Sequence, residues 1–139
     1  MSTEENKAKT RRFYEEVLSQ RNVDVLDEFI GAGFVDHNPN PGQAPGLEGV
    51  KQIFAQILVS FPDLHFTIED MIAEGDKVTT RLTLSGTHQG EFQGIPATGK
   101  QVAMTGIDII RIEGGKAVER WGEFDFLGMM QQLGVVPEG

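Results

Sequence analysis

Cysteine is absent from this 139-residue chain, which excludes disulfide bonds and thiolate chemistry. Long apolar runs are also lacking, because the most apolar stretch, residues 53–59, is far shorter than a membrane span. Positive charge is scarce: 12 Lys and Arg stand against 21 Asp and Glu, and the formal net charge is −9. Nucleic-acid backbones are bound by concentrated Lys and Arg. We therefore expect neither a nucleic acid nor a membrane as a partner.

Signatures of metal binding and nucleophilic catalysis are lacking as well. The three histidines, His37, His65 and His88, match no zinc-binding spacing. No serine lies in a nucleophile elbow, and the glycine-rich stretch 86–99 fits no phosphate-binding pattern. These absences predict a protein without metal or cofactor. No basic and then apolar leader precedes the first predicted helix, so we expect a cytoplasmic protein.

The first part of the chain has the patterns of helices. Residues Ser2 to Glu5 read as a capping box that begins the first helix. Asn22 can cap a short second helix that extends to Ile30, and residues 34–37 look extended. Across residues 47–61 the apolar side chains recur at i, i+3 and i+4, and Pro62 ends the pattern. This is the clearest of the three predicted helices.

After Pro62 the apolar period changes to two, which is typical of strands. We predict strands at 64–74, 77–88, 101–112 and 117–125, and a short helix at 126–133. Consecutive hairpins make an antiparallel sheet, and helices that precede it pack on one face. The expected fold is a single α+β domain over residues 1–139. Its three N-terminal helices pack on a curved antiparallel sheet, with a short C-terminal helix and a pocket for a small hydrophobic molecule.

The period of two also assigns strand residues to faces. Both faces of the strand 101–112 are apolar, so we expect it to be central and covered on both sides, with Asp108 among apolar neighbours. In the last strand Trp121, Glu123 and Asp125 share one face and Arg120 lies on the other. The pattern does not say which face looks inward. If the tryptophan face does, the Asp125 carboxyl group loses hydration and can exchange a proton near neutral pH.

Simpler roles stay open for the same side chains. Asp125 precedes the last predicted helix and can be its N-cap. Trp121 can be a core residue, and Glu123 can be a solvated residue at the rim of the pocket. Asp108 can pair with an arginine from a neighbouring strand.

Five segments occur in a fixed order along the chain: FVDHNP at 34–39, FPDL at 61–64, GTHQGEF at 86–92, GIPATGK at 94–100 and ERWGEFD at 119–125. Together they resemble the SnoaL-like family, which includes polyketide cyclases and proteins described as ester cyclases. The resemblance covers nearly the whole chain. It implies a cone-shaped α+β barrel, shared with nuclear transport factor, ketosteroid isomerase and limonene epoxide hydrolase. Such proteins are commonly dimers, so the resemblance also implies a homodimer.

The resemblance implies a catalytic residue too. In the cyclases an aspartate on the last strand is the general acid and base of an intramolecular aldol ring closure, without metal or cofactor. The motif assigns this role to Asp125, four residues after Trp121. The family pattern supports the aspartate with a histidine on the preceding strand, but residues 101–112 contain none and Asp108 lies in their middle. The epoxide hydrolases use an Arg-x-Asp motif, which this sequence lacks.

Two functions fit these residues. In the first, an enzyme acts on a polyketide-like or other aromatic carbonyl compound: Asp125 moves the proton, His88 or His37 donates a hydrogen bond, and Tyr14 stabilises an oxyanion. In the second, the pocket binds a small hydrophobic ligand without changing it, and methionines such as Met104 give an adaptable lining. Asp108, Trp121 and Glu123 complete the set of predicted substrate-binding residues. A third possibility is that the sheet chiefly serves dimerisation or a protein partner.

Overall fold

The structure is a computed structural model that describes residues 2–136, apart from the side chains of residues 18–20. Helix α1 (Thr3–Gln20) and the 3-10 helix η1 (Val23–Glu28) lead into strand β1 (Ile30–Asp36), which is followed by helix α2 (Gly46–Ser60). Strands β2 (His65–Glu74), β3 (Lys77–Thr87), β4 (Gln101–Glu113) and β5 (Lys116–Phe124) come next, and helix α3 (Phe126–Leu133) follows them. Residues 1 and 137–139 of the expected domain lie outside the described residues.

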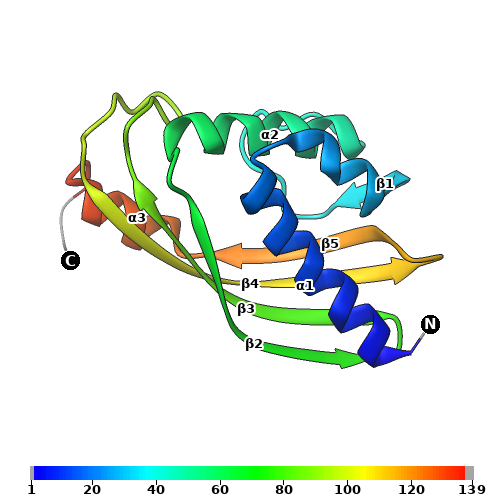
Figure 1. The fold of residues 1–139 in the computed structure, drawn as a ribbon. Coiled ribbons are helices and arrows are strands. Elements are labelled where there is room, and N and C mark those ends of the chain that lie inside the picture. The colour runs from blue at the N-terminus through cyan, green and yellow to red at the C-terminus, as the bar shows by residue number, and fades with distance from the viewer. Residues whose placement is uncertain (1, 137–139) are drawn as a thin grey trace.

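The strands form one five-stranded sheet in the order β1-β5-β4-β3-β2. Strands β2 to β5 make the predicted antiparallel meander, whereas β1 pairs in parallel with β5. The sheet is therefore mixed, with β1 and β2 at its edges. Figure 1 shows α1 and α2 on one side of the curved sheet and α3 beyond the end of β5. The predicted α+β fold with a curved sheet is confirmed, and none of the helices within residues 2–136 is long and apolar enough to cross a membrane.

Local sequence signals account for most element boundaries. Ser2 and Glu5 form the predicted capping box, in which each side chain accepts a hydrogen bond from the other residue's backbone N–H. Asn22 caps the second helix as expected, but this helix is a 3-10 helix that ends at Glu28. It stops there because the Phe29 carbonyl accepts a hydrogen bond from the Ala117 N–H at 2.7 Å, which draws the next residues into the sheet beside β5.

Strand β4 lies in the middle of the sheet, and helices cover only one of its faces. Val102, Met104, Asp108 and Ile110 point to this inner face and are buried. Ile107, on the outer face, is 45% exposed. The prediction that both faces of this strand are covered is wrong for a single chain, because all the long helices pack on the same side of the sheet (Figure 1).

A one-residue bulge in the hairpin between β4 and β5 decides which face of β5 looks inward. Ile112 lies opposite Ala117, but Arg111 lies opposite Glu119, so Val118 is the extra residue. Because side chains alternate along a strand, one extra residue reverses the face of every residue after it. The face that carries Arg120 therefore looks inward, and the face that carries Trp121 looks outward.

Candidate functional site

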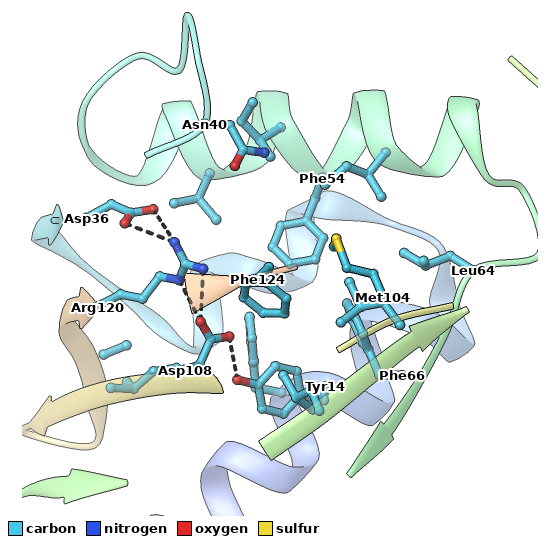
Figure 2. Close-up of a pocket in the computed structure, with 18 of the residues that line it drawn as sticks. Tyr14, Asp36, Asn40, Phe54, Leu64, Phe66, Met104, Asp108, Arg120 and Phe124 are labelled. Carbon is cyan, nitrogen blue, oxygen red and sulfur yellow. Dashed lines mark hydrogen bonds and ion pairs between the residues drawn. The ribbon is translucent and has the colours of Figure 1, made fainter. Parts of the chain in front are cut away.

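A cavity of about 160 Å³ lies between the helices and the inner face of the sheet. Most of its wall is apolar, whereas polar side chains gather at one end. Figure 2 shows this end, where Arg120 lies between Asp36 and Asp108 and the Tyr14 hydroxyl meets Asp108. The apolar wall includes Phe13, Phe54, Ile57, Leu64, Phe66, Leu82, Met104, Phe124 and Met129.

Asp108 is a deeply buried residue of the polar end, with 7% of its surface exposed. Its Oδ2 atom accepts a hydrogen bond from the Tyr14 hydroxyl at 3.0 Å, and its Oδ1 atom lies 2.9 Å from both Nε and Nη2 of Arg120. Burial raises the pKa of Asp108, although Arg120 and Tyr14 act in the opposite direction. A carboxyl group of this kind can bind and release a proton at a higher pH than an exposed aspartate.

Arg120 is shared by two carboxylates. Its Nη1 atom lies 3.1 and 3.2 Å from the two carboxylate oxygens of Asp36, and it also donates to the Asn38 carbonyl oxygen at 3.1 Å. Gln43 donates to Asp36 from the loop that follows β1, at 3.2 Å. With both aspartates ionised, the cluster has one negative charge in excess. The guanidinium is held from two sides, which fixes its position against Asp108.

Tyr14 brings helix α1 into the site. Its side chain is buried, and burial raises the pKa of the phenol well above its ordinary value, with the Asp108 charge acting in the same direction. The hydroxyl therefore stays protonated and donates a hydrogen bond to Asp108. Edge-to-face contact with Phe66, at 5.5 Å between ring centroids, fixes the ring.

Gly122 gives the ion pair its space. It lies directly opposite Asp108 in the β4–β5 register. A Cβ atom at this position would overlap both Nη2 of Arg120 and Oδ1 of Asp108. The absence of a side chain at residue 122 is thus a condition for the contact between Arg120 and Asp108.

The structure brings three of the predicted site residues together. Tyr14, Met104 and Asp108 all line the cavity. Asp108 also has the arginine partner from a neighbouring strand that the sequence left open, since Arg120 belongs to β5.

Asp125 lies elsewhere. It is the N-cap of α3, where its Oδ1 atom accepts a hydrogen bond from the Gly128 N–H at 2.8 Å, and it is exposed. It is not among the described residues that line the cavity. The physical reason is the bulge at Val118, which turns the tryptophan face of β5 outward. A catalytic role for Asp125 stays a prediction.

The remaining predicted residues also lie outside the cavity wall. His37 and Trp121 stack on the outer face of the sheet, with ring centroids 4.7 Å apart and an interplanar angle of 7°, and Glu123 is exposed on the same face. His37 Nε2 lies 2.8 Å from Glu119 Oε2. His88 is fully buried at the end of β3, where its Nδ1 atom lies 3.0 Å from Thr98 Oγ1 and its ring packs on Phe61.

Two residues of the polar end, Asp36 and Arg120, were not predicted. Asp36 belongs to the segment FVDHNP, which pointed to the family without giving a role to the aspartate. Arg120 lies on the face of the last strand opposite Trp121, and the choice between these faces was open. Within residues 2–136, no group of three or more His, Asp or Glu side chains is arranged to hold a metal ion.

Comparisons with known proteins agree with this architecture. The model of the SnoaL-like polyketide cyclase family matches residues 8–133. Aklanonic acid methyl ester cyclase DnrD of Streptomyces peucetius is 30% identical over 137 residues, which cover 93% of this chain and 92% of that protein. Aklanonic acid methyl ester cyclase DauD of Streptomyces sp. (strain C5) is 31% identical over 119 residues, or 83% of this chain and 72% of that protein. The solved structure of TsrD from Streptomyces laurentii is 30% identical, covers 98% of this chain and 99% of that chain, and has a TM-score of 0.88.

Proposed function

Since the chain belongs to the SnoaL-like polyketide cyclase family, we propose that it closes a ring in a polyketide-like carbonyl compound, with Asp108 as the acid and base. The observation that carries this proposal is the buried Asp108 carboxylate at the polar end of an apolar cavity, in contact with Tyr14 and Arg120. The two curated relatives are named for aklanonic acid methyl ester, so this ester is the first substrate to test.

The proposed reaction is an intramolecular aldol addition. The Asp108 carboxylate removes a proton from a carbon next to a carbonyl group, and the electron pair of that C–H bond forms an enolate. The enolate carbon then bonds to a second carbonyl carbon of the same molecule, whose oxygen becomes an alkoxide. Asp108 returns its proton to this oxygen. The product is an isomer of the substrate, so the atoms balance without a further reactant.

The neighbours of Asp108 have distinct roles in this scheme. Once protonated, Asp108 is a weaker hydrogen-bond acceptor, so the Tyr14 O–H and the Arg120 N–H groups that it held become available to the oxygen that gains charge. The apolar wall folds the substrate so that its two reacting carbons meet. Asp108 works as a base only when ionised. Because its pKa is raised, activity should increase with pH through a range above that of ordinary aspartates.

The test compares two aspartates. Asp108→Asn keeps the size of the side chain but removes the proton carrier, and it should lower kcat with aklanonic acid methyl ester by about 100-fold or more. The matched variant Asp125→Asn should stay close to the wild type, because asparagine is also a good N-cap. The cyclised isomer is followed by chromatography. If Asp108→Asn kept full activity and Asp125→Asn lost its activity, the proposal would be refuted and Asp125 would be assigned as the acid and base instead.

One observation favours a second candidate function. Both carboxylate oxygens of Asp108 already have partners, as in a structural ion pair, and the rest of the cavity is apolar. Under this alternative the protein binds a small hydrophobic ligand without changing it. The wild type would then bind the ester but form no product on long incubation, and Asp108→Asn would bind it with similar affinity.

We also propose that the protein is a homodimer through the outer face of the sheet. Ile72, Thr79, Ile109 and Trp121 lie opposite one another as a row across β2 to β5, and Ile72 is 63% exposed. A row in which three of four side chains are large and apolar gains by contact with a second copy. Light scattering after size exclusion should give twice the chain mass for the wild type and a smaller mass for Ile109→Glu. A monomeric wild type would refute the proposal.

A further inference from the structure

Helix α1 meets the sheet with polar as well as apolar side chains. Asn6, Thr10 and Tyr14 follow one another at intervals of four residues, so they share one face of the helix. Their exposed fractions are 3%, 3% and 2%. Thr80, on the inner face of β3, is 1% exposed. A buried polar layer therefore continues from the Asp108 site along the helix.

Thr80 is the neighbour of Asp108 on the adjacent strand β3. The two residues lie directly opposite each other in the β3–β4 register, so their side chains point to the same face. The Thr80 hydroxyl lies close enough to the Tyr14 hydroxyl to lower the pKa of the phenol, so the two hydroxyls are neighbours. Their separation or angle lies outside the range of an ordinary hydrogen bond, so Thr80 Oγ1 has no well-formed partner within residues 2–136.

Asn6 repeats this feature farther along the helix. Its Oδ1 atom is buried and likewise lacks a partner within residues 2–136. Buried oxygens without a hydrogen bond are costly, and internal water is the usual partner where protein groups supply none. Neither Asn6 nor Thr80 is among the described residues that line the cavity. Each of the two oxygens thus points to a polar site outside the lining of the substrate cavity.

We propose that internal water lies between α1 and β3, hydrogen-bonded to Thr80 and Asn6, and that it connects Asp108 with solvent while substrate fills the cavity. The Tyr14 and Thr80 hydroxyls can each accept one proton and donate another, so a proton can pass between Asp108 and the water without net change in either residue. The water site stands on the two buried oxygens alone. Its role as a proton route rests on the proposed function of Asp108.

The water site is tested without any substrate. Thr80→Val keeps the shape of the side chain but removes the hydroxyl, and Thr67→Val makes the same change at an exposed position of β2. If Thr80 binds water, its variant should lower the Tm by about 3 °C relative to Thr67→Val. A crystal structure of the wild type should show water on Thr80 Oγ1 and Asn6 Oδ1. The proposed water site would be refuted if Thr80→Val had a higher Tm than Thr67→Val. It would also be refuted if the crystal structure showed no water bound to Thr80 Oγ1 and Asn6 Oδ1.

The proton route is tested in deuterated water with aklanonic acid methyl ester. Enolisation that reverses before ring closure places solvent deuterium on the recovered ester, at a rate set by the exchange of the Asp108 proton. Deuterium uptake per cyclised product, corrected for uptake without enzyme, should fall several-fold in Thr80→Val. An unchanged ratio would refute the route. A wild type that cyclises nothing would instead count against the proposed function, and the water site would still be decided by the experiment without substrate.

Discussion

Gly122→Ala is a direct test of the polar end, because it adds one methyl group beside the contact between Arg120 and Asp108. The new Cβ would overlap both Nη2 of Arg120 and Oδ1 of Asp108. The end of the arginine side chain can move, but it is also tied to Asp36 and Asn38. The short Asp108 side chain has little freedom in the middle of β4. We therefore expect the substitution to separate the pair rather than to be absorbed.

The expected loss of stability follows from the hydrogen bonds between Arg120 and Asp108 that the substitution would break. Loss of one hydrogen bond between buried charged groups costs about 2 kcal/mol, which for a domain of this size lowers the Tm by roughly 6 °C. The cyclase activity should fall at the same time, because Asp108 loses the group that positions it.

The measurement is thermal unfolding by circular dichroism, with Gly33→Ala as the control. Nothing lies within 4 Å of a Cβ atom at residue 33, so that variant should be neutral or slightly more stable. In an Asp108→Ala background the effect of Gly122→Ala should shrink to less than half, since the contact between Arg120 and Asp108 that the methyl group would break is already absent. Equal Tm values for Gly122→Ala and Gly33→Ala would refute the register and geometry described for this site.

Three further predictions concern individual carboxylates. Burial raises the pKa of Asp108. The stability that this shift contributes is therefore present below the ordinary value of 3.8 and is lost as the pH rises through the raised pKa. The urea midpoint of Asp108→Asn should change less across this pH range than that of the wild type. The Thr87 backbone N–H and hydroxyl lower the pKa of Asp63, so its contribution is present above the ordinary value and is lost as the pH falls through the lowered one. Asp63→Asn should therefore have a lower Tm than the wild type at pH 7, and its Tm should decrease less on acidification. Asp125→Ala should cost about 1 kcal/mol in urea unfolding, whereas Asp125→Asn should not, if the N-cap is the main structural role of this residue.

Periodicity and capping patterns predicted most of the fold. The capping box at Ser2, the helical pattern that ends before Pro62 and the turn at Gly75 each act within a few residues, so the printed sequence contains all that is needed to read them. The parallel pairing of β1 with β5 could not be read in this way. It joins residues far apart in the chain, and the segment Ile30–Asp36 has no clear alternation.

The candidate site was predicted less well, and one residue explains why. Without the bulge at Val118, Asp108 would lie opposite Trp121, and the tryptophan face would look into the cavity as assumed. No local signal marks Val118 as an extra residue in the strand. The family motif also drew attention to Asp125, whereas the cluster of Asp36, Asp108 and Arg120 forms only when three strands come together.

The chain's one tryptophan and one tyrosine lie on opposite sides of the sheet. Trp121 stacks on His37 and has the Lys77 ammonium group 5.7 Å from its ring, whereas Tyr14 lines the cavity. Their optical signals therefore report separate events. Tryptophan emission should follow what covers the outer face, including a second copy of the chain, whereas difference absorption of Tyr14 should follow occupation of the cavity. An unlabelled wild-type sample can thus report assembly and ligand binding independently.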